Sequence, residues 1–392
     1  MKKATRHQTK DHNSRLVLRT IYGAGAISRA EIARQTQLTR PTVSTLVAEL
    51  LDSALVVETG QGPSAGGKRP TLVAVNGRGR ALLALDLSGG EFRGAVVNLN
   101  GGIVYRAALP ASAPGGATLD PVGELIDQLL LHTGPSPLGI GVATPGLVDP
   151  HHGIVLRAVN LGWVNLPLRD LLATRYGLPV HVANDSHMAA LAEFTYGAAR
   201  PPANLIVLRI GQGTGAGVIL NGQPFYGDGF GAGEIGHVVV DPEGVLCSCG
   251  NRGCLETTSS TPAILRAATA ADRTQSTLAG SQPVTWERFV AAVHSHDPVA
   301  VDVAVRAGRH LGAAVAHLVG AYNIQTIVLA GRIADLGDVL LDAVTAEMHQ
   351  RVLPAMAAVT TVRFPSLAAG QMGDIITLGC SALVLHRELG IV

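Results

Sequence analysis

The chain has 392 residues, of which 47% are hydrophobic and 15% charged, so it can form two or three domains with sizeable cores. No apolar run is long enough to cross a membrane, and residues 1–15 lack the apolar core of a secretory signal. Because the few thiols are clustered as if for a metal, we expect a cytoplasmic protein without membrane contacts.

The charge is distributed unevenly along the chain, although the net charge is only +1. Residues 1–80 contain 13 Lys or Arg against 5 Asp or Glu, a charge of +8, and the remainder contains 17 against 24, a charge of −7. A small basic domain attached to a large acidic one is typical of a protein whose first domain binds a polyanion. A basic surface that is merely solvated would have the same composition.

The first eighty residues predict three helices. The first runs from Asn13 to about Gly23, and the second, from Ser28 to about Thr36, opens with a Ser-x-x-Glu capping box. Thr39 is the expected N-cap of the third helix. One face of that helix carries apolar residues at a helical spacing: Val43, Leu46, Val47, Leu50 and Leu51.

The opposite face of the third helix is polar at its N-terminal end. It carries Arg40, Thr42, Ser44 and Thr45. Hydroxyl groups and an arginine at this place are typical of a recognition helix that contacts base edges and phosphates.

Two short apolar strands follow the third helix, at 55–57 and 71–75. The loop between them carries Lys68 and Arg69 beside glycines, which suits contact with phosphates or a minor groove. This order predicts a winged helix-turn-helix domain at 1–78, with the wing and linker at 60–72, that binds double-stranded DNA. The alternative is a small helical adaptor whose loop is only solvated.

From about Ala81 onward, strands and helices alternate in two successive units. The first opens with three strands joined by tight turns, at 81–87, 92–98 and 103–109, and the second opens with a strand at 205–210 and a Gly-rich turn before a strand at 218–220. Two α/β units that each open with a β-meander predict an α/β, actin-like fold. This is a duplicated ribonuclease-H-like arrangement with a cleft between its two lobes.

The bounds of the two lobes follow from this pattern. We expect the first lobe at 79–195, joined by a C-terminal helix at 373–388. The second, larger lobe is expected at 196–372, where it would hold the dimer contacts. Further expected elements are helices at 121–132 and 298–322 and strands at 138–143, 180–183 and 326–330.

The most distinctive stretch runs from Gly233 to Glu256 and reads GEIGHVVVDPEGVLCSCGNRGCLE. It contains His237, Cys247, Cys249 and Cys254. One histidine and three thiolates form a closed four-coordinate set, which suits one structural zinc ion per chain better than a catalytic one. The alternative is a group of buried or redox-active cysteines. A metal loop here would hold Glu234 and Glu256 in one wall of a polar pocket.

Several other residues are expected to face the cleft. The turn from Asp86 to Gly90 can cradle phosphate with backbone N–H groups, or can simply join two strands. The Gly-rich stretch 211–217, which includes Thr214, is a second and more specific candidate. Asn184 and Asp185 follow a strand and precede a helix, where α/β proteins place polar groups that face a ligand. For Asp185, a helix cap is the alternative.

A further group of side chains matches a polyol. Asn160, Glu234, His237 and Glu256 offer carboxylate, amide and imidazole groups that can each bind neighbouring hydroxyls, as buried sugar sites do.

These residues together resemble the ROK family of repressors, open reading frames and sugar kinases, over essentially the whole chain. The family's most specific signature is GEIGH followed by CxCGxxGCxE, and this chain matches it as GEIGH…CSCGNRGCLE. The resemblance implies an actin-like kinase fold and structural zinc at the four residues above. It also implies sugar contacts from Asn160, Asn184, Asp185, Glu234, His237 and Glu256. The NLGW stretch at 160–163 is one residue shorter than the family's sugar loop.

The chain departs from the ROK kinases at the first phosphate loop. Those enzymes carry DxGGTK, and here the loop reads DLSGGEF, with Ser88 for a glycine, Gly90 for the threonine and Glu91 where a lysine is usual. A carboxylate beside a triphosphate is repulsive, so ATP is not expected as a cofactor. The phosphate loops are interpreted as vestigial at Asp86, Ser88, Gly89, Gly90, Gly213, Thr214 and Gly215. Asp185, which matches the general base of a kinase, is retained, but we expect no catalytic residue.

The favoured hypothesis is therefore a sugar-responsive DNA-binding regulator, most simply a repressor of genes for carbohydrate uptake or catabolism. It would bind a palindromic operator as a homodimer or tetramer, and sugar in the cleft would change operator affinity. The rival hypothesis is an ATP-dependent sugar kinase with an appended DNA-binding domain. A third is a regulator without a small ligand that responds to a protein partner.

Overall fold

The computed structural model describes residues 6–63, 69–111, 118–134, 137–197, 202–274, 276–280, 282–368 and 371–391. The chain divides into two compact units, Met1–Asn184 with Ile376–Val392, and Asp185–Ile375. The division falls after Asn184 and not at 195, where the sequence pattern predicts it, because helix α6 (Asp185–Ala192) packs against strands of the second unit.

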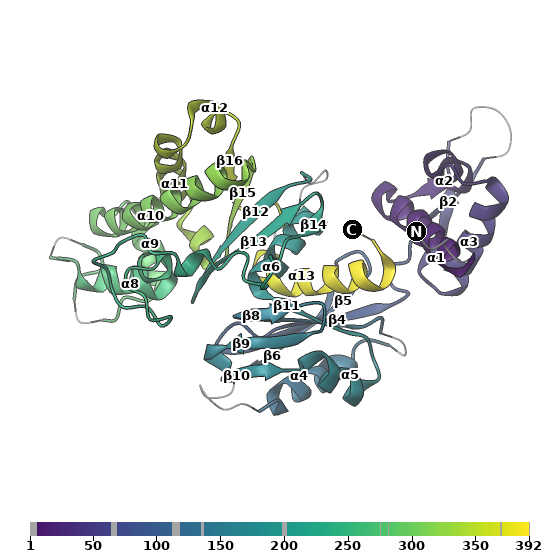
Figure 1. The fold of residues 1–392 in the computed structure, drawn as a ribbon, viewed down its shortest axis with the longest axis horizontal. Coiled ribbons are helices and arrows are strands. Elements are labelled where there is room, and N and C mark those ends of the chain that lie inside the picture. Colours follow the sequence, from purple (N-terminus) through teal and green to yellow (C-terminus); the bar gives the residue numbers. More distant parts are fainter. Residues whose placement is uncertain are drawn as a thin grey trace. The chain divides into compact units, whose positions relative to one another are not determined.

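The first unit begins with three helices and a small antiparallel sheet of order β1-β3-β2 (Figure 1). The elements are α1 (Arg6–Ala24), β1 (Ile27–Ser28), α2 (Arg29–Thr36), α3 (Arg40–Asp52), β2 (Val56–Gln61) and β3 (Thr71–Val75). Both predicted caps are present, because Ser28 accepts a hydrogen bond from the Glu31 N–H and Thr39 accepts one from the Thr42 N–H. The turn between α2 and α3 is made by Gln37, whose φ of 58° is left-handed.

The remainder of the first unit is a five-stranded sheet of order β11-β7-β4-β5-β6. Its strands are β4 (Ala81–Asp86), β5 (Glu91–Asn98), β6 (Ile103–Pro110), β7 (Ile140–Thr144) and β11 (Val180–Asn184). Figure 1 shows α4 (Asp120–Leu130) and α5 (Leu168–Tyr176) on one face of this sheet and α13 (Ile375–Val384) on the other. The helices cover both faces, so the strands at the centre of the sheet are apolar on both sides.

A third sheet in the first unit, smaller than the main one, was not predicted. It has the order β10-β9-β8 and consists of β8 (Leu147–Asp149), β9 (Ile154–Ala158) and β10 (Trp163–Leu166), with a 3₁₀ turn η1 (Val159–Leu161) between the last two. Its inward residues Val148, Val155 and Trp163 join the core of the main sheet. This sheet carries the chain between β7 and α5.

The second unit is built on a five-stranded sheet of order β14-β13-β12-β15-β16. Its strands are β12 (Leu205–Ile210), β13 (Thr214–Leu220), β14 (Gln223–Pro224), β15 (Thr326–Ala330) and β16 (Thr361–Arg363). In both units, the first three strands along the chain pair in antiparallel fashion. Two later strands then extend the sheet in parallel from the first strand of that group, so the two sheets have the same topology. This is the duplicated, actin-like arrangement that the two β-meanders predicted.

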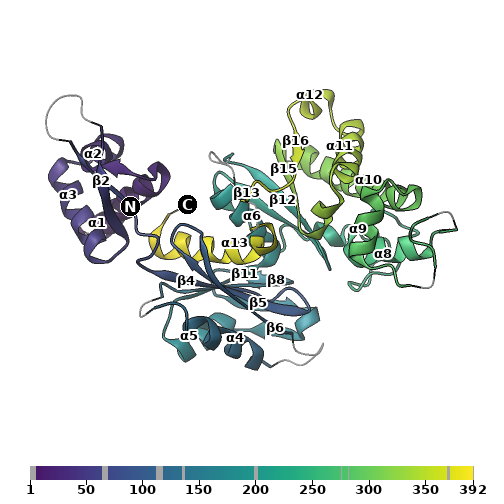
Figure 2. The ribbon, with the colours of Figure 1, turned by 180° about the vertical axis from the view of Figure 1, so that it is seen from behind.

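Helices cover both faces of the second sheet. Helix α6 packs on β12 and β13, and the buried face of α10 (Pro298–Tyr322) contributes Leu311 and Val315 to the core with Ile206 and Leu208. Helices α10 and α11 (Asp338–Arg351) lie side by side in Figures 1 and 2. The other elements are η2 (Glu193–Gly197), η3 (Ile235–His237), α7 (Leu255–Ser259), α8 (Thr261–Ala270), α9 (Trp286–His294), η4 (Arg332–Leu336), α12 (Pro354–Ala357) and η5 (Met372–Asp374), and in the first unit η6 (Leu385–Leu389). Within the described ranges, the helices are all too short or too polar to cross a membrane.

The start of α10 depends on one buried carboxylate. Asp297 caps the helix by accepting from the Val299 and Ala300 N–H groups, and it also accepts from the backbone and hydroxyl of Thr277 and the hydroxyl of Ser276. Burial raises the pKa of Asp297, but these donors outweigh burial and hold the pKa below its usual value.

We expect Asp297→Ala to lower the free energy of unfolding by about 2–4 kcal/mol, because it removes a cap and leaves buried donors without an acceptor. The stabilisation is present above the unfolded-state pKa of about 4 and is lost as the pH falls through the lower folded-state value. Urea unfolding at several pH values measures both effects. Asp302→Ala on the exposed side of the same helix is the control and should change stability by less than about 0.5 kcal/mol. Equal losses in the two variants would contradict this role.

Candidate functional site

The structure brings the four predicted metal ligands together. One ligand atom from each of His237, Cys247, Cys249 and Cys254 lies within 4.8 Å of all the others. Cys249 Sγ and Cys254 Sγ are 3.6 Å apart, and Cys247 Sγ is 3.5 Å from His237 Nδ1. No disulfide forms among the cysteines in the described part of the chain.

The local backbone explains how these side chains converge. Two isolated bridges, Val239 with Cys254 and Leu246 with Arg252, pair the segments on either side of the loop. The Cys247 N–H donates to the Asn251 carbonyl at 2.8 Å, which closes a tight turn around Cys249. Cys254 then becomes the N-cap position of α7, so the loop ends where a helix begins.

The thiols differ in their tendency to ionise. The Asn251 N–H is the largest influence on Cys249 and lowers the pKa of its thiol. Burial and the neighbouring sulfur atoms raise the pKa of Cys254 to about 12. Three thiolates this close repel one another unless a cation compensates their charge, which is the situation of a metal site.

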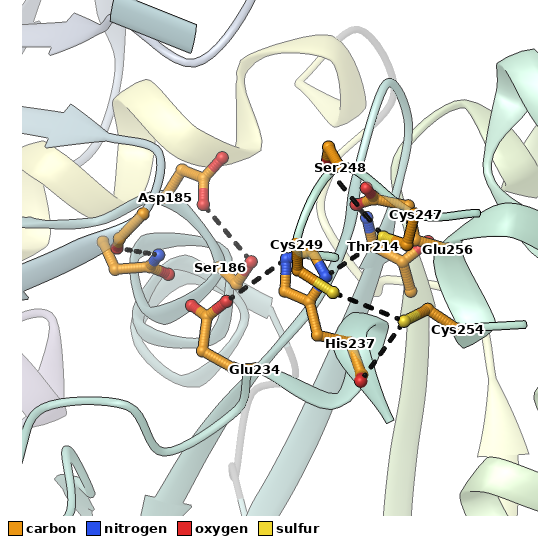
Figure 3. A network of polar contacts seen from close by, with 12 residues as sticks. Asp185, Ser186, Thr214, Glu234, His237, Cys247, Ser248, Cys249, Cys254 and Glu256 are labelled. Atoms are coloured by element: carbon orange, nitrogen blue, oxygen red, sulfur yellow. Dashed lines mark hydrogen bonds and ion pairs between the residues drawn. The ribbon is translucent and has the colours of Figure 1, made fainter. Parts of the chain in front are cut away.

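The carboxylates of Asp185, Glu234 and Glu256 lie near one another in the second unit, and Glu234 is the one beside His237. Glu234 Oε2 lies 4.0 Å from His237 Nε2, and Figure 3 shows the Glu234 side chain directed towards the His237 ring. Burial is the largest influence on Glu234 and raises its pKa; His237 opposes the shift, and the charges of Asp185 and Glu256 add to it. The predicted sugar-binding residues of the second unit therefore form one polar cluster, which can accept hydrogen bonds from several hydroxyls.

Asp185 carries an ion pair that was not predicted from the sequence. It is 3% exposed, at the first position of α6, and its Oδ2 accepts from Arg209 Nη2, while Ser186 Oγ lies 3.3 Å from its Oδ1. The available signal was Arg209 itself, because a lone charge in the apolar strand Leu205–Ile210 needs a buried carboxylate as partner.

Glu256 connects the cluster to the second Gly-rich stretch. Its Oε2 accepts from the Thr214 N–H at 2.9 Å. Thr214 Oγ1 and Arg209 Nε are buried and find no hydrogen-bond partner among the described residues. Buried polar atoms of this kind are expected where a bound ligand or an ordered water completes the bonding.

The expected position of this Gly-rich stretch was partly wrong. Strand β13 begins at Thr214 and not at Val218, so only Gly211–Gly213 form the turn. Gly215 and Gly217 lie within strand β13. They are glycines because α6 packs so close to the strand that a side chain would not fit. A Cβ added at Gly217 would lie 2.2 Å from the Ser186 carbonyl oxygen.

Two predicted sugar contacts belong to the first unit. Asn184 ends β11 and donates from Nδ2 to the Gly146 carbonyl at 2.9 Å. Asn160 is exposed on the turn η1. The other four, Asp185, Glu234, His237 and Glu256, belong to the second unit.

In the first phosphate loop, both donors of Ser88 are bonded within the loop. Asp86 Oδ1 accepts from the Ser88 N–H at 2.9 Å and from the Ser88 hydroxyl at 2.6 Å, and Glu91 pairs with Arg93. Gly89 and Gly90 complete the turn into β5. An N–H that is already bonded to a carboxylate is not available to a phosphate.

The N-terminal domain presents the predicted DNA-contacting residues at the start of α3. Arg40, Ser44 and Thr45 are exposed, and Thr42 is half-buried with its hydroxyl 2.8 Å from the Thr39 hydroxyl. In the wing, Arg69 is exposed, and Lys68 lies outside the described residues.

Arg40→Ala is expected to weaken specific operator binding by roughly 5- to 100-fold, because one arginine contact to a base or phosphate is worth about 1–3 kcal/mol. Fluorescence anisotropy at fixed salt measures the loss. Arg34→Ala is a charge-matched control, because Arg34 is held by Glu31 on α2. Similar losses in both variants would indicate a general effect of charge and would contradict a specific contact.

The comparisons with known proteins identify the chain. Residues 82–387 match the ROK family. The chain belongs to the ROK family. Residues 13–69, which include helices α2 and α3 and strand β2, match the MarR family. The ROK match thus covers both five-stranded sheets and the Cys/His cluster.

ROK proteins similar to this chain include regulators and an enzyme. The xylose repressor of Caldicellulosiruptor bescii is 30% identical over 393 residues, which cover 97% of each chain. A crystal structure of a ROK family transcriptional regulator, a homolog of the E. coli MLC protein, matches with a TM-score of 0.83 at 28% identity and covers 97% of this chain and 98% of that one. The glucokinase of Halalkalibacterium halodurans is 33% identical over 321 residues, 79% of this chain and 96% of the enzyme. The regulators therefore match nearly the whole chain, and the enzyme matches a smaller share.

Proposed function

We propose that this ROK protein is a sugar-responsive, DNA-binding transcriptional repressor, with genes of carbohydrate uptake or catabolism as its targets. The observation that carries the proposal is the polar cluster of Asp185, Glu234, His237 and Glu256 in a chain that also has a helix-turn-helix domain. The full-length similarity to a xylose repressor supports it.

The ligand proposed for the cluster is a neutral sugar. Three carboxylates face one arginine and one histidine, so the cluster would repel a phosphate or a sugar acid and attract hydroxyl groups. Asn160 and Asn184 are proposed as further contacts. Sugar binding would change operator affinity only if the sugar binds one arrangement of the protein more tightly than another.

A structural zinc ion, one per chain, is proposed at the Cys/His cluster. A tetrahedral site with Zn–S bonds of about 2.3 Å places two sulfurs about 3.8 Å apart, close to the 3.6 Å between Cys249 and Cys254. The fourth donor is His237 Nδ1, so Nε2 remains directed at Glu234. The metal would neutralise the thiolates and fix Glu234, His237 and Glu256 in place without an open coordination position.

The chain is proposed to lack sugar kinase activity. Asp86 engages the Ser88 N–H, Glu91 would repel a triphosphate, and Arg209 holds Asp185, the residue that matches the general base of a kinase. The alternative is an ATP-dependent kinase with an added DNA-binding domain, which the retained Asp185 and the similarity to a glucokinase favour. Enzyme-like ADP release with a hexose would contradict our proposal. Otherwise, the triple change Ser88→Gly, Gly90→Thr and Glu91→Lys tests whether the loop is what prevents activity.

The operator is proposed to be a palindrome bound by a homodimer or tetramer, since one winged helix reads only a half-site. Residues 196–372 are proposed to supply the dimer contacts.

The test of the proposed function is fluorescence anisotropy of the purified protein on the DNA upstream of its own gene, at stated salt, with a panel of pentoses and hexoses. We expect specific binding that one sugar shifts. Specific binding that no sugar alters would contradict the sugar response and favour a protein partner. Absence of specific binding, together with ATP turnover, would favour the kinase.

A further inference from the structure

The C-terminal end of the chain contacts the DNA-binding domain directly. Arg19, on helix α1, donates from Nε and Nη2 to the carbonyl oxygen of Gly390 at 3.2 and 2.9 Å. These atoms are separated by 371 positions in the sequence and lie in the same compact unit. A helix of the DNA-binding domain is therefore attached to the last turn of the ROK domain.

The conformation in which the C-terminal helix ends makes the carbonyl oxygen of Gly390 available as the acceptor. Gly390 takes the left-handed cap position after η6, with φ of 64°, and its own N–H donates to the His386 carbonyl. Its carbonyl then points away from the helix and towards α1. A Cβ added at Gly390 would lie 2.8 Å from Arg15 Cδ, so Arg15 and Arg19, one turn apart on α1, both lie against this residue.

The same C-terminal turn is tied to the strand that precedes the polar cluster. Glu388 Oε1 lies 2.7 Å from Nε2 of His181, which is on β11. Strand β11 ends at Asn184, and the next residue is Asp185, the carboxylate held by Arg209. Only three residues of one strand separate the contact with Glu388 from that carboxylate.

Helix α13 provides a second connection. The chain returns from the second unit to the first at Ile375, where α13 begins, and the helical path continues through η6 to Gly390. Cys380 Sγ donates to the Leu85 carbonyl of β4 at 3.2 Å, and Leu378, Cys380 and Val384 are buried. Both places where the chain crosses between the units, after Asn184 and at Ile375, are thus connected to the turn that Arg19 contacts.

We propose that Arg19 is the positioning residue that couples the sugar site to the DNA-binding domain, through its hydrogen bonds to Gly390. The inference rests on the proposed function and adds the route by which sugar binding would affect the DNA-binding domain. A change at Asp185 or at the start of α13 shifts the turn at Glu388–Gly390, and Arg19 carries the shift to α1. Because α1 packs against α2 and α3, the orientation of the recognition helix follows. Coupling requires two arrangements that differ in this contact.

The experiment compares Arg19→Gln with the wild type and with Lys10→Gln. Lys10 is on the same helix and pairs with Glu49, so its variant removes the same charge and leaves Gly390 untouched. Arg19 is exposed, so its replacement should not prevent folding. Operator affinity is measured by anisotropy with and without D-xylose, D-glucose or N-acetylglucosamine, whichever shifts the wild type most. The readout is the factor by which the sugar changes the operator Kd, calculated as the larger of the two Kd values divided by the smaller.

For Arg19→Gln, we expect this ratio to fall to less than about a fifth of the wild-type value, while sugar affinity measured by calorimetry without DNA stays unchanged. Lys10→Gln should keep the wild-type ratio. Hydrogen exchange should show that the sugar changes protection of α1 in the wild type but not in Arg19→Gln. A wild-type ratio in Arg19→Gln would overturn the coupling role alone. A wild-type protein that responds to no sugar would overturn the proposed function and this inference with it.

Discussion

A chain that carries Cys254→Ser is expected to lose the proposed zinc ion and at least about 3 kcal/mol of unfolding free energy, because the proposed site loses one of four ligands in a fully buried position. Sugar binding should weaken as well, since Glu256 lies two residues beyond Cys254 at the start of α7. Zinc per chain is measured by elemental analysis, and stability by urea unfolding.

The matched control is Cys380→Ser. Cys380 is equally buried but lies on α13, far along the chain from the cluster, with its Sγ bonded to the Leu85 carbonyl. It should keep one zinc per chain, whatever its own effect on stability. Full zinc content in Cys254→Ser, or a wild-type protein without metal, would show that the cluster is not a zinc site. The remaining hypothesis would then be a group of buried or redox-active cysteines.

The parts of the fold that could be predicted are those with strong periodicity and clear ends. Helix α10 was predicted with its observed bounds because Asp297 and Pro298 start it and Asn323, in a left-handed conformation, ends it. Strands β12 and β15 were predicted for a similar reason, since each is a short apolar run that ends at a glycine. The convergence of His237, Cys247, Cys249 and Cys254 was predictable because cysteine is otherwise so rare in the chain.

The parts that could not be predicted depend on tertiary contacts. Strands β8, β9 and β10 have only three to five residues, and their pairing is with one another across intervening turns, so no segment has a pattern of its own. The start of β13 was missed because its glycines indicate a turn, whereas in the fold they make room for α6. The contact of Arg19 with Gly390 joins opposite ends of the chain, and nothing near either residue indicates it.

Glu234→Gln is expected to raise the Kd for the effector sugar by roughly 10- to 100-fold and to abolish the shift in operator affinity at moderate sugar concentration. A hydrogen bond from a sugar hydroxyl to a charged acceptor contributes about 1.5–3 kcal/mol, and glutamine replaces one acceptor oxygen by a donor while it keeps the shape. Glu234 interacts with every other member of the cluster, because its carboxylate lies 4.0 Å from His237 Nε2 (Figure 3) and responds to the charges of Asp185 and Glu256. Calorimetry with the sugar and anisotropy with the operator measure the two effects.

Operator affinity in the absence of sugar should stay at the wild-type value in this variant, because Glu234 is in the second unit and the helix-turn-helix is in the first. Glu243→Gln makes the same chemical change on an exposed residue of the same loop, outside the carboxylate cluster, and should leave the sugar response intact. If both variants respond to sugar as the wild type does, the carboxylate cluster is not the sugar site. If both lose the response, the change acts through the metal loop as a whole, and the zinc content of each variant then separates a disturbed loop from a lost sugar contact.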